Sequence, residues 1–183
     1  MTPPLRNRRA LAALFAASGY ARGAEIGVGD GVHARALLDA IPGLFLYCVD
    51  PWDDGGGNRR GESSYQATLA ALEPYRGQVD IVRMTSAEAL AEWTAGPLDF
   101  VFIDGAHDYA SVARDIAGWA PKVRPGGIVS GHDYYTLKAS KVGGVVNAVD
   151  DYARARRIDL QVTSWDRANP AQDERQPCWW FLA

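Results

Sequence analysis

Acidic and histidine side chains in this 183-residue chain gather directly after stretches that are typical of short buried strands. Asp104 and His107 follow the run LDFVFI, and the pair His132-Asp133 follows IVSG. Two carboxylates and two imidazoles that converge can bind a divalent cation, or one histidine can act alone as a general base. Such a group predicts catalysis; the alternative is that His132 and Asp133 only position loops or cap the next helix.

A glycine-rich turn near the N-terminus indicates a ligand of a different kind. Glycines 27, 29 and 31 follow a short apolar strand, and they allow the backbone to turn tightly and to approach a ligand closely. The NAD fingerprint requires glycine at position 32, where this chain has Val32. The acid Glu25 inside the strand either contacts the ligand or has a structural partner, since buried acids need partners.

Asp50 ends the next apolar strand, 21 residues after Gly29. A carboxylate at this spacing can accept hydrogen bonds from both hydroxyls of a ribose, so the glycine turn and Asp50 together favour an adenosine ligand. Asp50 precedes Pro51, and a turn-opening Asp is the alternative interpretation.

Strands and helices alternate along the chain in the way that positions such residues together. Apolar runs predict strands at 24–28, 44–50, 79–84, 98–104 and 128–134, with helices between them and RPGG at 124–127 as a turn. A short helix is expected to begin at a capping Ser86, and a serine cap is expected before the helix at 63–77. Two last strands, 158–164 and 178–183, should pair antiparallel, because no helix separates them. The sequence therefore predicts an α/β, doubly wound, Rossmann-like fold with a seven-stranded, mostly parallel sheet.

The length and composition fit one domain, 1–183, with an N-terminal helix in 1–22 and the Rossmann-like core in 24–183. A net charge of −3 provides no positive field for nucleic acid or an anionic membrane, and no stretch is apolar enough to cross one. Cys48 and Cys178 lie far apart in apolar strands, which predicts free thiols and a cytoplasmic protein. Arg8-Arg9 before an alanine-rich run resembles a short export signal, but an amphipathic helix from about Arg6 to Ser18 is the preferred interpretation.

Four motifs, EIGVGDG, VDPW, FIDGAHDYASVARDI and PGGIVSGHDY, resemble those of class I S-adenosylmethionine-dependent methyltransferases, in the small branch related to macrolide and sugar O-methyltransferases. The resemblance runs from about Ala24 to Tyr152. It implies that Glu25, Gly27 and Gly29 hold the methionine part of S-adenosylmethionine. The further cofactor residues that it implies are Asp50 at the ribose, Trp52 near the ribose or adenine, Ser86 at the adenine edge and Asp104 at the methionine amino group or reaction centre. Trp52 is equally well explained as a core or lid aromatic.

The resemblance also places the fourth and fifth strands side by side, so that Asp104, His107, His132 and Asp133 converge beside the methyl group. The related enzymes have aspartates at the positions of Asp104, His132 and Asp133, which implies a magnesium or manganese site here. His132 replaces one of these aspartates and favours a softer metal than magnesium. Without a metal, His107 is the expected general base, with His132 second. The expected acceptor is a hydroxyl group of a small molecule.

Two other functions remain open from the residues. Tyr134 and Lys138 match the Tyr-x-x-x-Lys spacing of short-chain dehydrogenases, which would make the chain an NAD(P)-dependent oxidoreductase, although the pair falls in a polar loop. A non-catalytic adenosine-binding module on the same fold is the second alternative. The loops 53–61 and 135–144 are expected to shape the substrate pocket. A homo-oligomer also stays open, since the Trp-rich C-terminus fits either a core strand or an interface.

Overall fold

The computed structural model describes residues 5–53, 61–136, 143–170 and 175–183, which form helices around one seven-stranded sheet. The strand order is β3-β2-β1-β4-β5-β7-β6, with β7 antiparallel to both of its neighbours and the other pairings parallel. This confirms the predicted fold class, including the antiparallel C-terminal hairpin. The strands are β1 (Arg22–Ile26), β2 (Phe45–Val49), β3 (Val79–Val82), β4 (Leu98–Ile103), β5 (Val123–Gly131), β6 (Gln161–Val162) and β7 (Trp179–Leu182).

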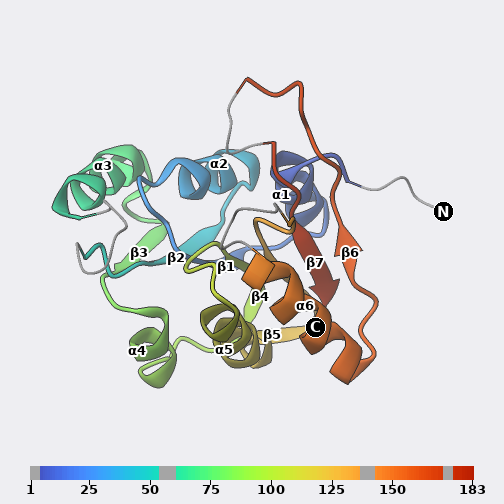
Figure 1. The fold of residues 1–183 in the computed structure, drawn as a ribbon. Helices are drawn as coiled ribbons and strands as arrows, with labels where there is room; N and C mark the ends of the chain where they lie inside the picture. Colours follow the sequence, from blue (N-terminus) through green and yellow to red (C-terminus); the bar gives the residue numbers. More distant parts are fainter. Residues whose placement is uncertain (1–4, 54–60, 137–142, 171–174) are drawn as a thin grey trace.

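The helices cover both faces of the sheet, with α1, α2 and α3 on one side and α4, α5 and α6 on the other (Figure 1). Short 3-10 turns follow α3 and α5, at Glu73–Tyr75 and Ala120–Lys122. No helix in the described ranges is long and apolar enough to span a membrane. The helices are α1 (Arg8–Ala17), α2 (Val32–Ala40), α3 (Glu62–Leu72), α4 (Ser86–Ala91), α5 (Tyr109–Trp119) and α6 (Gly143–Arg156).

Alternation along the strands creates one hydrophobic cluster on each face. In β2, Leu46 and Cys48 are buried against α1 and α2, whereas Tyr47 and Val49 are buried in the cluster that contains α5 and α6. Successive side chains of a strand point to opposite faces, so a strand covered on both sides is apolar throughout. This is why the central strands have continuous apolar sequences.

The parallel register brings the carboxyl ends of the central strands to one edge. Ile26 of β1 is paired with Val49 of β2 and with Ile103 of β4, and Ile103 is paired with Gly131 of β5. The residues that follow these strand ends therefore emerge side by side, as expected for a ligand site in an open α/β sheet.

Three local expectations are corrected by the structure. The cap of α4 is Thr85, whose hydroxyl accepts from the Glu88 N–H while the Glu88 carboxylate accepts from the Thr85 N–H, and Ser86 is the first helical residue. Gly61, not a serine, precedes α3. The predicted turn at 124–127 lies within β5, which begins at Val123 and has a register shift opposite Leu98 and Phe100.

Candidate active site

The turn after β1 requires glycine for steric reasons. Gly27, Gly29 and Gly31 all have positive φ angles, of 90°, 58° and 77°. A Cβ atom on Gly27 would lie 2.3 Å from the backbone oxygen of Asp104, so β1 and β4 can approach each other only with glycine at this position. Gly27 thus allows the turn after β1 to lie directly against the segment that follows β4.

Asp50 holds this turn from the end of β2. Its Oδ2 accepts hydrogen bonds from the N–H groups of Val28 (2.9 Å) and Gly29 (3.0 Å), and its Oδ1 accepts from the Trp52 N–H (2.8 Å). Hydrogen bonds to a carboxylate are stronger than those between neutral groups. The residue expected to contact ribose therefore also fixes the conformation of the glycine turn.

Trp52 is a core residue that supports the same turn. Its side chain is 1% exposed, its Nε1–H donates to the Gly29 carbonyl oxygen at 2.8 Å, and its ring packs on Tyr65. It lines neither of the two cavities described below. Its position agrees with the core-aromatic interpretation and not with contact to the cofactor.

The first cavity, of about 310 Å³, opens at the ends of β1, β2 and β4 and at the starts of α4 and α5. Asp50 and Ser86 are on its wall, as expected for residues near an adenosine. The Ser86 hydroxyl donates to Asp115 Oδ1 at 2.6 Å and accepts from the Trp119 Nε1–H at 2.9 Å. Asp115 also lines the cavity, and burial raises its pKa. Asp115 was not among the predicted site residues, because it lies in the middle of an amphipathic helix.

The second cavity, of about 300 Å³, lies on the other side of Gly27 and Asp104, which line both cavities. Most of the ionisable residues predicted for the site line this second cavity. These are Glu25, Asp104, His107, His132 and Asp133, together with Arg8, Asp30 and His33, which the sequence did not single out. The two cavities together provide adjacent spaces that meet at the end of β4.

Glu25 lines the second cavity, and only one of its two carboxylate oxygens has a hydrogen-bond partner among the described residues. The side chain is 1% exposed, and Oε1 lies 3.0 Å from His33 Nδ1, while Oε2 has no hydrogen-bond partner in the described part of the chain. Burial raises the pKa of Glu25 to about 8, against the smaller lowering effect of Arg8. An ammonium group is one donor that would satisfy Oε2, so the amino acid portion of S-adenosylmethionine fits this position.

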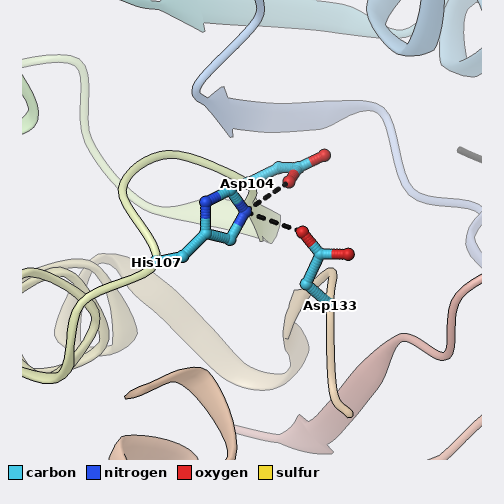
Figure 2. Close-up of side chains that lie close together, drawn as sticks. All are labelled: Asp104, His107 and Asp133. Carbon is cyan, nitrogen blue, oxygen red and sulfur yellow. Dashed lines mark ion pairs between the residues drawn. The ribbon is translucent and has the colours of Figure 1, made fainter. Parts of the chain in front are cut away.

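Three residues from the ends of β4 and β5 form a compact cluster (Figure 2). His107 Nε2 lies 2.7 Å from Asp133 Oδ2 and 3.9 Å from Asp104 Oδ1. Asp133 has a φ angle of 57°, a left-handed conformation that is uncommon outside glycine and often occurs at functional sites. The backbone thus turns the Asp133 carboxylate toward His107.

His132 lies beside the same carboxylates but outside the compact cluster. Its Nδ1 is 3.2 Å from Asp133 Oδ1 and 3.7 Å from Asp104 Oδ1, and its side chain is almost fully buried. Asp104, His107 and Asp133 can each direct one ligand atom to within 4.8 Å of the others, which suits a divalent cation. The predicted metal set of Asp104, His132 and Asp133 thus shares two members with this group, and His107 takes the third place.

Mutual charges set the protonation of the cluster. Burial opposes ionisation of Asp133, but hydrogen bonds from His107 and His132 outweigh it and lower the Asp133 pKa. The hydrogen bond with Asp133 raises the pKa of His107, and nearby Asp104 and Asp133 raise that of His132 despite its burial. Burial raises the pKa of Asp104. A mixed set of carboxylate and imidazole donors fits manganese or a similar metal better than magnesium.

The residue pair that suggested a dehydrogenase does not form a site in the described residues. The Tyr134 hydroxyl donates to Asp150 Oδ1 at 2.6 Å, which ties the end of β5 to α6. Lys138 lies outside the described residues, as do most of the two loops at 53–61 and 135–144 that were expected to shape the pocket. Tyr134 therefore has a structural partner.

Comparison with known proteins gives a family for the chain. A family model described as a methyltransferase domain matches residues 24–134, which is more than half of the sequence. The O-methyltransferase from Bacillus cereus in complex with SAH has a similar structure, with a TM-score of 0.74 at 15% identity over 96% of this chain and 80% of that one. The O-methyltransferase TomG from Streptomyces achromogenes, in complex with SAM, has a TM-score of 0.70 at 18% identity, over 96% and 78% of the two chains.

One curated relative is much longer than this chain. The uncharacterized protein y4gI of Sinorhizobium fredii is 32% identical over 88 residues, which are 48% of this chain and 10% of the relative. The chain thus spans a small part of that protein's length.

Proposed function

Because the chain belongs to the methyltransferase domain family, as its motifs indicated, we propose that it transfers the methyl group of S-adenosylmethionine to a hydroxyl group of a small molecule. The observation that carries this proposal is the meeting of the two cavities at Gly27 and Asp104. The first cavity has Asp50 and Ser86 on its wall, and the second has the glycine turn and the histidine–carboxylate cluster. A cofactor that extends across this junction would present its methyl group to the cluster.

The cofactor residues in this proposal are those that the motifs implied and that line the cavities. Glu25, Gly27 and Gly29 would surround the methionine part. Asp50 would contact the ribose and Ser86 the adenine edge in the first cavity. Asp104 lies between the two groups and would face the reaction centre.

When bound, the cofactor supplies an electrophilic methyl group on a positively charged sulfur. The acceptor oxygen forms a bond to the methyl carbon, the carbon–sulfur bond breaks and S-adenosylhomocysteine leaves. The contribution of the protein is to align the acceptor and to take its proton. His107 lines the second cavity and would take this proton at Nδ1, because Nε2 faces Asp133 Oδ2 at 2.7 Å.

A divalent cation is the alternative use of the same residues. Asp104, His107 and Asp133 would hold it, with His132 supporting the carboxylates, and the cation would lower the pKa of the acceptor hydroxyl. The two alternatives require different tautomers of His107. A metal ligand at Nε2 leaves the proton on Nδ1, whereas a general base at Nδ1 has the proton on Nε2, so ¹⁵N NMR of the imidazole distinguishes them.

The first test is calorimetric titration of metal-free protein with S-adenosylmethionine and, separately, with NAD. Binding of the first alone is expected; preference for NAD would overturn the methyltransferase proposal and favour the oxidoreductase. Methyl-labelled cofactor is then incubated with a panel of hydroxylated small molecules, with EDTA or with Mn²⁺ or Mg²⁺. Label transfer supports the enzyme, whereas cofactor binding without transfer to any acceptor supports an adenosine-binding module.

Residues 1–183 are proposed to act as one methyltransferase domain, with the N-terminal helix packed on the Rossmann-like core. The acidic net charge argues against a nucleic-acid substrate. Cys48 and Cys178 are buried and form no disulfide with each other, which is compatible with the proposed cytoplasmic location.

A further inference from the structure

The start of α1 is held in place by the segment between β6 and β7. Asn7 caps the helix by accepting from the Ala10 N–H, and its own amide donates to Asp166 Oδ2 at 2.8 Å. Arg6 donates to the other carboxylate oxygen of Asp166 at 3.0 Å, and the Ser164 N–H donates to the Leu5 carbonyl at 2.9 Å. These contacts fix the direction in which the first residue of α1 points.

That first residue, Arg8, is a charged side chain that is only 8% exposed. It lines the second cavity together with Glu25 and His33, and its charge is the strongest influence opposing the effect of burial on Glu25. One end of the cavity thus has a cationic and an anionic side chain close together.

Arg8 lies at the α2 side of the cavity. Arg8 and His33 also line a groove between α1 and α2, whereas none of the residues of the histidine–carboxylate cluster reaches that groove. Arg8 thus lies near the expected methionine position at Glu25, and its charge also acts on Asp104 and His132.

We propose that Arg8 binds the carboxylate of the cofactor's amino acid group while Glu25 Oε2 accepts from its ammonium group. An α-amino acid has a negative and a positive group on neighbouring atoms, which matches the adjacent positive and negative side chains. The planar guanidinium can donate two parallel hydrogen bonds to a carboxylate. The inference rests on the proposed function and makes α1 part of the cofactor site.

The test compares two ligands that differ only in this carboxylate: S-adenosylhomocysteine and its decarboxylated analogue, 5′-deoxy-5′-(3-aminopropylthio)adenosine. Calorimetry measures both with wild type, Arg8→Met and Arg9→Met. Arg9 is the matched control, because it has the same charge on an exposed position of the same helix and does not line the second cavity. Wild type and Arg9→Met are expected to bind S-adenosylhomocysteine about tenfold to a hundredfold more tightly than the analogue.

Arg8→Met is expected to lose this preference while its affinity for the analogue stays unchanged. Equal weakening of both ligands would show a structural role for Arg8, and unchanged affinities would show no contact; either result overturns the proposal. A raised KM for an anionic acceptor with unchanged S-adenosylhomocysteine affinity would also overturn it. If wild type binds neither ligand, the proposed function itself fails. Arg8→Lys keeps the charge and is expected to retain part of the preference, which covers the case in which Arg8→Met does not fold.

Discussion

The two cavities that meet at Gly27 and Asp104 differ in how far the protein satisfies its own polar groups. In the first cavity, Asp50 accepts three backbone hydrogen bonds, and the Ser86 hydroxyl is both donor and acceptor. In the second, Glu25 Oε2 and His132 Nε2 are buried without hydrogen-bond partners in the described ranges. Buried polar groups are normally paired, so unpaired ones gather where a ligand or a reaction supplies the partner. Under the proposed function, the first cavity is a preformed binding surface, whereas the second keeps bonding capacity for the amino acid group of the cofactor and for the reaction.

The largest expected effect on stability and cofactor affinity comes from Asp50 in the first cavity. Asp50→Ala leaves two N–H groups of the glycine turn and that of Trp52 without their acceptor, and it should reduce the free energy of unfolding by about 3 kcal/mol. The affinity for S-adenosylmethionine should fall about a hundredfold, because the turn and the proposed ribose contact are lost together. Urea denaturation and calorimetry measure the two effects.

Asp53→Ala is the control for this change, because Asp53 also lines the first cavity but is exposed. It should leave stability unchanged. A stable Asp50→Ala protein with normal cofactor affinity would contradict the description of the first cavity as preformed by Asp50.

In the second cavity, Asp133→Asn should reduce kcat and leave cofactor affinity unchanged. The substitution removes the carboxylate that pairs with both histidines, and loss of a positioned acid–base group typically costs about 10²- to 10⁴-fold in rate. Steady-state kinetics with an acceptor found in the label-transfer screen tests this. Tyr134→Phe, which removes only the hydrogen bond to Asp150, is the neighbouring control; equal losses in both variants would argue for a structural effect.

Glu25 should make cofactor binding dependent on pH. The pKa of about 8 means that free protein holds a proton on Glu25 at neutral pH, whereas a bound ammonium favours the ionised carboxylate. Binding should therefore release a proton, and affinity should rise as pH increases from about 6 to 8 and then level off. Calorimetry in buffers of different ionisation enthalpy measures the released proton.

Two controls isolate this effect. Glu25→Gln should remove the proton release. Methylthioadenosine lacks the amino acid group of the cofactor, including its ammonium, and should bind without releasing a proton. A heat of binding that is independent of the buffer in wild type would contradict the assignment of Glu25 to the ammonium group.

The smallest expected effect concerns Ser86→Ala. Its hydroxyl connects Asp115 and Trp119, so its removal should cost about 1 kcal/mol of stability and weaken cofactor binding only a few-fold. Thermal unfolding and calorimetry measure both. A loss of binding as large as that of Asp50→Ala would show that the adenine contact, and not the turn, dominates the first cavity.

The sequence predicted the parts of the site that follow from backbone geometry. Apolar strand runs predicted the sheet, and the strand ends predicted that Glu25, the glycines, Asp50, Asp104 and the His132-Asp133 pair lie at one edge, because side chains after parallel strands converge there. Their roles toward a cofactor or a metal stay predictions. The positive φ angles explain why glycine spacing was informative.

The sequence was less informative where the direction of a side chain decides its role. Trp52 follows Asp50 closely but points into the core, and it is His107, not His132, that joins the compact cluster. Arg8 and Asp115 lie in amphipathic helices whose rotation relative to the sheet depends on tertiary packing. The position of Arg8 depends on Asp166, which is more than 150 residues away in the chain.

The contact between Asp166 and the start of α1 connects distant segments of the chain energetically. If Arg8 contributes to cofactor affinity, then by thermodynamic reciprocity the bound cofactor stabilises the contacts that hold Arg8. The Ser164 N–H and Asp166 N–H donate to Leu5 and Arg175, and local opening of these bonds governs their hydrogen exchange. Saturation with cofactor should therefore slow deuterium uptake at these two amides, so that the segment after β6 reports on occupancy of a site at the other end of the sequence.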